Sequence, residues 1–316
     1  MPPPRPSVIT VLGAQRFDPS LGTAVAALNV KGRIAIITAG WQERESDDRE
    51  LAEHLDKRVI NLRLHARAEE IFTEDPELRA AHRERQEALR HRQDFYRIRL
   101  EYAVEAERVI RQRSAPAAIL AEQAAESAFA IRELDASHLA LCGRIRAEFE
   151  AKWDLARRPL VARHREELAA LIGDCSTIAI AGGHVATLLN RLLLFGMAGL
   201  FGERPIFAWS AGAMALTERV LLFHDDPPQG PGTSELLDFG LGILPGLVVL
   251  PRPEERLHLD DRDRMQRLVE RFQPARCLAL PERSWVQWRD GVLAEPHGVL
   301  ALAADGTSDK LPGDLA

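Results

Sequence analysis

The chain has 316 residues, and its 41 basic side chains against 47 acidic ones give a net charge of −6. A hydrophobic fraction of 46% and a charged fraction of 28% are usual for globular proteins, which excludes disorder as a description of the whole chain. The charge balance gives no indication of electrostatic binding to nucleic acid or to an anionic membrane, so neither partner is expected.

The cysteines and the apolar runs indicate a compartment. Cys142, Cys175 and Cys277 are odd in number and widely spaced, which fits neither a disulfide framework nor a paired metal site. The first residues hold no apolar run long enough for a signal peptide, and no run elsewhere reaches the length of a bilayer span. We therefore expect reduced, partly buried cysteines in a cytoplasmic protein.

Residues 1–68 are predicted to form the N-terminal part of an α/β domain. Val8-Ile-Thr-Val-Leu12 and Arg33-Ile-Ala-Ile-Ile37 are short β-branched runs, and each is followed by glycine and then a polar segment. Continuously apolar runs of this kind are typical of parallel strands that are covered on both faces.

Residues 69–172 are predicted to be a helical insertion, a long helix hairpin. Strand patterns vanish here, and apolar residues such as Phe95, Ile98 and Tyr102 recur at helical spacing. Ser114-Ala-Pro116 is predicted to open the second long helix as a cap followed by proline. Three roles stay open for the insertion: a hairpin packed on the domain, homo-oligomer assembly through its apolar stripe, and a substrate gate or partner surface.

Residues 173–316 return to the α/β pattern and are predicted to complete the domain. Helices are expected near residues 186–195 and 262–272. The predicted strands are Thr177–Ala181, Pro205–Trp209, one within Leu241–Leu250, Cys277–Leu280, Trp285–Trp288 and Val299–Leu302. Turns are expected at Asp290-Gly291 and Asp305-Gly306. The fold class that follows is α/β, with three layers around a mostly parallel sheet and a long helical insertion.

A serine follows one predicted strand, in Ala208-Trp-Ser-Ala-Gly212. Small residues around a serine at a sharp strand-to-helix turn are typical of a catalytic nucleophile, whose hydroxyl must stand clear of the backbone. The alternative interpretation is a serine that only caps the following helix. The sequence of the turn alone leaves both open.

A pair of glycines, Gly182 and Gly183, follows another predicted strand. Adjacent glycines let the backbone approach a ligand closely and direct an N–H group at a developing oxyanion, although a plain turn has the same composition. The serine turn and the glycine pair, each at the end of a predicted strand, are together more informative than either alone.

Three segments in this order resemble the successive motifs of the cyanophycinase and dipeptidase E family of serine peptidases. They are Ala179-Ile-Ala-Gly-Gly-His184, Ala208-Trp-Ser-Ala-Gly-Ala213 and Leu241-Gly-Ile-Leu-Pro-Gly-Leu-Val-Val249. The resemblance covers residues 173–302 well and 7–62 weakly, and it leaves out the helical region. It implies a fold like that of class I glutamine amidotransferases and cleavage of a peptide or isopeptide bond.

The resemblance also implies roles for single residues. Ser210 corresponds to the nucleophile, and the backbone N–H groups of Gly183 and Ala211 correspond to the oxyanion hole. In the family an acidic residue follows the nucleophile, and Asp225 stands at that place here, although Asp225-Asp226 also fits a solvated turn.

The general base departs from the family pattern. Family members carry a histidine shortly after the Leu-Pro-Gly strand, and Arg252 stands at that position here. A guanidinium stays protonated, so Arg252 cannot accept the serine proton. His258 precedes an Arg-rich segment that resembles the cyanophycinase pattern and is the preferred replacement, ahead of His224 and His184.

Two functions therefore remain open. The first is a serine hydrolase with Ser210, His258 and Asp225 as catalytic residues, and with Arg252, Arg256 and His184 as substrate-binding residues for a peptide or small molecule. The second is a catalytically silent relative, in which Arg252 replaces the base and the protein binds a ligand or another protein. No cofactor or metal is expected, because no HExxH, Cys/His cluster, GxGxxG or phosphate-binding loop occurs.

Overall fold

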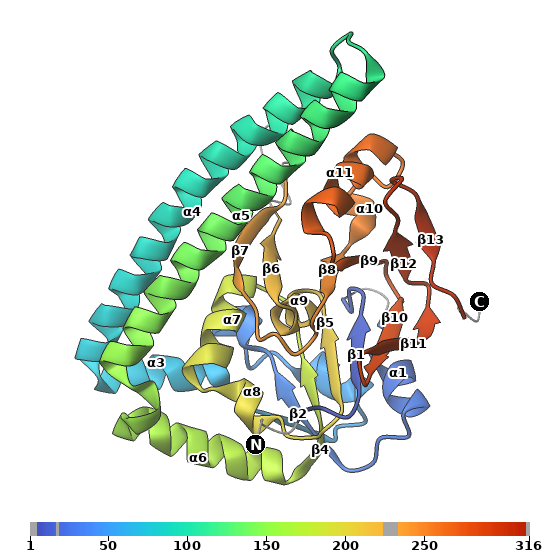
Figure 1. The fold of residues 1–316 in the computed structure, drawn as a ribbon. Helices are drawn as coiled ribbons and strands as arrows, with labels where there is room; N and C mark the ends of the chain where they lie inside the picture. Colours follow the sequence, from blue (N-terminus) through green and yellow to red (C-terminus); the bar gives the residue numbers. More distant parts are fainter. Residues whose placement is uncertain (1–4, 17–18, 224–232, 314–316) are drawn as a thin grey trace.

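The computed structural model describes residues 5–16, 19–223 and 233–313. A seven-stranded sheet in the order β11-β10-β1-β5-β4-β2-β3 forms the centre of the molecule (Figure 1). Its parallel part consists of β1 (Ile9–Leu12), β5 (Ile206–Trp209), β4 (Cys175–Ile180), β2 (Arg33–Ile37) and β3 (Val59–Asn61). At one edge β10 (Trp285–Arg289) and β11 (Val292–His297) add antiparallel pairs.

Helices cover both faces of this sheet, so the predicted three-layer α/β class is confirmed. Along β2 the side chains alternate: Ile34 and Ile36 pack in one core with α1 (Leu21–Ala27) and α2 (Arg49–His54). Ile37 belongs to the opposite core together with α7 (Val185–Leu194). The continuous apolar character that predicted covered strands therefore reflects burial from two sides.

Smaller elements complete the body. The structure also contains η1 (Ala39–Arg44), α3 (Leu64–Glu74), η2 (Leu155–Arg157), α6 (Pro159–Gly173), α8 (Met197–Leu200), α9 (Ala211–Leu216), α10 (Pro253–Arg256) and α11 (Arg262–Phe272). A four-stranded sheet joins β13 (Ser308–Lys310), β12 (Leu300–Leu302), β9 (Arg276–Leu280) and β8 (Leu247–Pro251), and a two-stranded sheet joins β6 (Arg219–Leu222) and β7 (Glu235–Phe239). The predicted turns at Asp290-Gly291 and Asp305-Gly306 connect β10 to β11 and β12 to β13.

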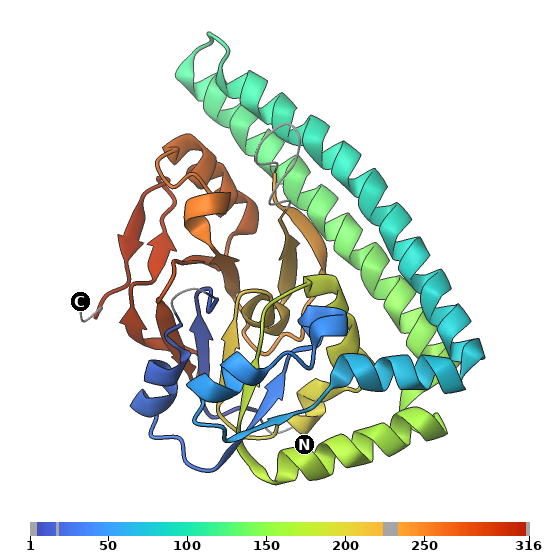
Figure 2. The ribbon, with the colours of Figure 1, turned by 180° about the vertical axis from the view of Figure 1, so that it is seen from behind.

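The helical insertion is a long antiparallel pair, α4 (Pro76–Arg111) and α5 (Ala117–Trp153), that runs along one side of the body (Figures 1 and 2). Pro116, rather than Ser114, occupies the N-cap position of α5. The pair packs differently from the predicted stripe: Phe95, Ile98 and Tyr102 are mostly exposed. Homo-oligomer assembly through this surface stays a prediction.

The buried face of α4 combines core residues such as Leu78 and Leu100 with a polar network around Tyr96. The Tyr96 hydroxyl donates to the Asp135 carboxylate of α5 at 2.7 Å, and the Arg271 guanidinium of α11 donates to both carboxylate oxygens at 2.7 and 2.9 Å. Arg271 also donates to the carbonyl oxygen of Ser234 at 2.7 Å. A buried ion pair is tolerable only when its hydrogen bonds are satisfied, and this network satisfies those of Asp135 and Arg271 with partners from α4, α5, α11 and the Ser234 carbonyl.

A second group of polar contacts joins the insertion to α7. The side chains of Arg85 and Gln86 both donate to Asn190 Oδ1 at 3.0 Å. Arg191 on the next position donates to Glu69 at 2.8 Å. The insertion therefore supports the helix that begins directly after the glycine pair.

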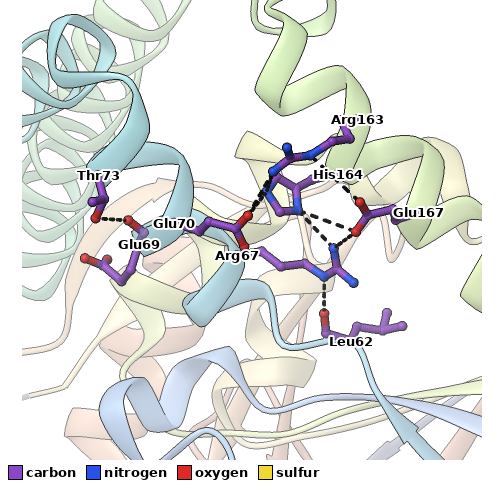
Figure 3. A network of polar contacts seen from close by, with 8 residues as sticks. All are labelled: Leu62, Arg67, Glu69, Glu70, Thr73, Arg163, His164 and Glu167. Carbon is purple, nitrogen blue, oxygen red and sulfur yellow. Dashed lines mark hydrogen bonds and ion pairs between the residues drawn. The ribbon is translucent and has the colours of Figure 1, made fainter.

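The base of the insertion is closed by ion pairs. Arg158, just before α6, donates to both carboxylate oxygens of Asp75, the N-cap residue of α4. Figure 3 shows a neighbouring network in which His164 of α6 lies between Arg67 and Glu70 of α3, flanked by Glu167. The two ends of the insertion are thus held side by side where they leave the body.

The three cysteines are buried and form no disulfide. Within the described part of the chain, none of the helices combines the length and the apolar character that a membrane crossing needs.

Candidate functional site

Three strand ends meet at very close range at the edge of the sheet. A Cβ atom added at Gly182 would lie 2.8 Å from the Cβ of Ser210, and one added at Gly40 would lie 2.6 Å from the Gly182 carbonyl oxygen. Gly183 has φ +115° and lies against the backbone of Gly40. Only glycine fits at these positions, because a side chain there would meet the neighbouring backbone or the Ser210 side chain.

Ser210 stands in a strained backbone conformation between β5 and α9. Its φ of 50° and ψ of −122° are costly for a residue with a Cβ, and such strain persists only where the surrounding structure imposes it. Ser210 occupies the N-cap position of α9, yet its side chain accepts no capping hydrogen bond. The Ser210 hydroxyl therefore makes no hydrogen bond that caps α9 in this structure.

Ser210 opens onto a cavity of about 570 Å³. Of the predicted site residues, Gly183, His184, Ser210, Ala211, Arg252 and Arg256 all line it. Its other charged or titratable walls come from Arg16, Asp47, Glu50, His54, Glu255 and Glu282. The cavity therefore combines apolar walls, such as Trp41 and Phe223, with side chains of both signs of charge, which suits a ligand with apolar and ionic groups.

Two arginines of the cavity come from the segment after β8. Arg252 has φ 56° and forms an ion pair with Glu255. Arg256 donates to the carbonyl oxygen of Pro251 at 3.3 Å, and its guanidinium lies 4.9 Å from the centre of the Phe223 ring. Both guanidinium groups thus have neighbours that orient them at the cavity wall.

The predicted base and acid are not assembled with the serine in the described residues. His258 is exposed, has φ 52° and does not line the cavity. Asp225, Asp226 and His224 lie outside the described residues. The roles of His258 and Asp225 stay predictions.

The loop after β2 contributes to the site although no sequence motif indicates it. Gln42 there has φ 57° and ψ −124°, nearly the same backbone angles as Ser210, and Trp41, Asp47, Glu50 and His54 contribute to the cavity wall. One signal was present: Gly40 follows a predicted strand just as Gly182 does. A third strand end with a glycine could have been counted with the other two.

Comparisons with known proteins found no match by sequence and a distant likeness to a solved structure. No model of a protein family matches the chain, and no curated protein matches it. A solved structure described as a peptidase from an acI-B1 Actinobacterium is 13% identical and aligns over 96% of this chain and 97% of that chain, with a TM-score of 0.47. A likeness this distant carries no conclusion about chemistry.

Proposed function

We propose that the protein is a serine hydrolase of the cyanophycinase and dipeptidase E kind, which cleaves a peptide or isopeptide bond with Ser210 as nucleophile. The observation that carries the proposal is the strained Ser210 turn, whose hydroxyl does not cap its helix and which opens onto a cavity with charged walls beside Gly183. Such a backbone conformation lowers the stability of the fold, and it is typical of a nucleophile that is held clear of the backbone.

The proposed reaction proceeds through an acyl-enzyme. Ser210 Oγ attacks the carbonyl carbon while a base takes its proton, and the backbone N–H groups of Gly183 and Ala211 hold the oxyanion. The base then gives the proton to the leaving amine as the C–N bond breaks. Water attacks the ester in the second half of the cycle and regenerates the hydroxyl.

The base of this scheme is a histidine, with His258 as the candidate from the resemblance and Asp225 as its partner. In the described conformation His258 is outside the cavity wall, whereas His54 lines it from the end of α2. A general base has to come within hydrogen-bond reach of the hydroxyl. Variants of both histidines, and of His224, therefore belong in the test.

The arginines favour substrates that carry a carboxylate. Arg252 and Arg256 enter the cavity from one segment, and guanidinium groups bind carboxylates through charge-assisted hydrogen bonds. Peptides with an acidic side chain or a free C-terminus are the proposed substrates.

A second candidate function is ligand binding without catalysis. The observation that favours it is that Arg252, which cannot act as a base, lines the cavity where the family has its histidine, while His258 does not. In this case the strained serine would be a remnant, and the arginines would bind an anionic ligand.

The decisive experiment is labelling with a fluorophosphonate probe that reacts with activated serines. For the hydrolase, we expect labelling of the parent, its complete loss in Ser210→Ala, and a loss of at least about 100-fold in rate in the variant that lacks the base, whether His258→Ala, His54→Ala or His224→Ala. Ser46→Ala, at an exposed serine outside the cavity lining, is the matched control and should label like the parent.

The same experiment separates the two candidates. If the parent is not labelled but Arg252→His is, the silent alternative replaces the hydrolase proposal. If neither is labelled, the nucleophile role of Ser210 is refuted.

A further inference from the structure

His184 uses its ring nitrogen Nδ1 in a hydrogen bond to the start of α7. Nδ1 accepts a hydrogen bond from the backbone N–H of Thr187 at 3.2 Å, which makes His184 the cap of α7. A backbone N–H can only donate, so Nδ1 must present its lone pair. A neutral imidazole carries one proton, and in this arrangement that proton belongs on Nε2.

The loop after β2 reinforces the same assignment. Gln42 Nε2 donates to Thr187 Oγ1 at 3.0 Å, which leaves the hydroxyl proton of Thr187 to point at His184 Nδ1, 2.9 Å away. The Gly40 carbonyl oxygen accepts the backbone N–H of His184 at 2.8 Å. The side chains of Gln42 and Thr187, together with one backbone group, thus orient the imidazole at the cavity.

We propose that His184 binds the substrate as a neutral hydrogen-bond donor, through Nε2–H, to a carboxylate or carbonyl oxygen of an acyl ligand in the Ser210 cavity. The ring is exposed, lines the cavity and directly follows Gly183. This inference rests on the proposed function only in taking the cavity as the place where an acyl ligand binds.

The same geometry assigns His184 a role other than the base. A nitrogen that takes the Ser210 proton must offer a lone pair, and the lone pair of the neutral ring is already used at Nδ1 in the helix cap. In a ring protonated on both nitrogens, Nδ1–H and the Thr187 N–H would both be donors, and the hydrogen bond that caps α7 would be lost. Gln42 and Thr187 are positioning residues that act through His184.

The test reads the tautomer directly. Long-range ¹⁵N–¹H spectra of ¹⁵N-histidine-labelled Ser210→Ala protein, assigned with an additional His184→Gln change, should show at pH 8 an unprotonated Nδ1 and a protonated Nε2. Thr187→Val removes the hydroxyl but keeps the backbone donor, and it should lower the share of this tautomer. A ring that carries its proton on Nδ1 in the Thr187-containing protein overturns the proposal.

Binding is tested in the same spectra with two probes. N-acetylglycine offers a carboxylate, whereas N-acetylglycinamide offers only carbonyl oxygens. A saturable shift of the His184 Nε2–H signal with N-acetylglycine alone identifies a carboxylate subsite, and a shift with both identifies a carbonyl subsite. If neither probe moves this signal, the donor role is refuted.

Two variants separate hydrogen bonding from packing. His184→Gln keeps an N–H donor and should bind the effective probe within about twofold of the histidine protein, whereas His184→Leu should weaken binding about fivefold or more. Equal affinity of the Gln and Leu variants contradicts the proposal. Because these measurements use Ser210→Ala protein, a failure of fluorophosphonate labelling in the parent would refute the hydrolase and leave this outcome unaffected.

Discussion

The Gly40 carbonyl oxygen and the His184 backbone N–H are joined by a hydrogen bond of 2.8 Å, which links the loop after β2 to the segment that carries the glycine pair. The two residues come from adjacent parallel strands and are separated in sequence by the whole helical insertion. Their contact fixes the backbone of Gly183 between them, so the proposed oxyanion donor depends on a loop that the sequence motifs do not include.

Substitution of Gly183 tests this close approach. In Gly183→Ala the new methyl group would meet the Gly40 carbonyl, and the φ of +115° would be strained as well. We expect a loss of more than about 2 kcal/mol in the free energy of unfolding, measured by urea denaturation. Gly242→Ala is the matched control, because Gly242 has φ +64° with no atom within 4 Å of the added Cβ, and strain alone should cost about 1 kcal/mol. Equal losses would show that the close approach is unimportant.

The backbone strain at Ser210 should be measurable as a difference in stability between two variants that both lack the hydroxyl. Both Ser210→Ala and Ser210→Gly remove the hydroxyl, but only glycine adopts φ 50° with ψ −122° at low cost. We expect the Gly variant to be more stable to unfolding than the Ala variant by about 1 kcal/mol. Ala213 lies inside α9 and is the control position. There glycine should be less stable than alanine, the opposite of the order expected at position 210. A Ser210→Gly protein less stable than Ser210→Ala would argue against strain at the serine turn.

His82 should make the protein less stable in acid. Burial, followed by the charges of Arg85 and Arg191, lowers the pKa of His82 from 6.5 to about 3. The unfolded chain takes up this proton below pH 6.5 while the folded protein does not, so the stability contributed by neutral His82 is lost progressively from pH 6.5 down to about 3. At pH 5 this loss is about 2 kcal/mol.

The measurement for His82 is urea denaturation of the parent and His82→Leu at pH 7.5 and pH 5. The parent should lose about 2 kcal/mol more than the variant between these two values. His91→Gln, at an exposed position of the same helix, should behave like the parent. The prediction fails if His82→Leu retains the full pH dependence.

The buried pair of Asp135 and Arg271 should show strong coupling. Asp135→Asn leaves the buried Arg271 guanidinium without its counter-charge, and we expect a loss of about 3–5 kcal/mol in the free energy of unfolding. Arg271→Met should cost a similar amount, because it leaves the carboxylate uncompensated. The double variant should be more stable than the sum of the two losses implies, as a double-mutant cycle would measure. Additive losses would show that the pair does not interact.

Much of the fold follows from local sequence patterns, and the exceptions have physical causes. Arg33–Ile37 and Arg262–Phe272 were bounded correctly from periodicity, because a strand covered on both faces and an amphipathic helix carry strong local signals. The buried face of α4 was not predictable in this way. Tyr96 is buried with its hydroxyl hydrogen-bonded to Asp135 and Arg271, whereas the more apolar Phe95 is exposed. Such a choice depends on partners that are remote in the sequence.

The candidate site was predictable only where the sequence has motifs. Ser210 and the glycine pair follow recognisable strand ends, and the structure brings them together. The walls formed by Asp47, Glu50 and His54 have no motif, since exposed charged residues in or just before a short helix look the same whether or not a cavity lies beside them. The tautomer of His184 likewise depends on a threonine hydroxyl and a distant glutamine amide, which only the assembled fold places.

The ion pair of Asp75 with Arg158 has a consequence for the order in which the chain assembles. Pairing of β2 with β4 requires the closure of a loop that includes all of α4 and α5, and closure entropy grows with the length of flexible chain between the paired segments. If the two helices associate first, as neighbours in sequence readily do, their contact brings positions 75 and 158 together and removes most of that loop. The paired helices would then bring β4 close to β2 during folding, and with these strands the Gly40 loop and the glycine pair that meet at the edge of the sheet.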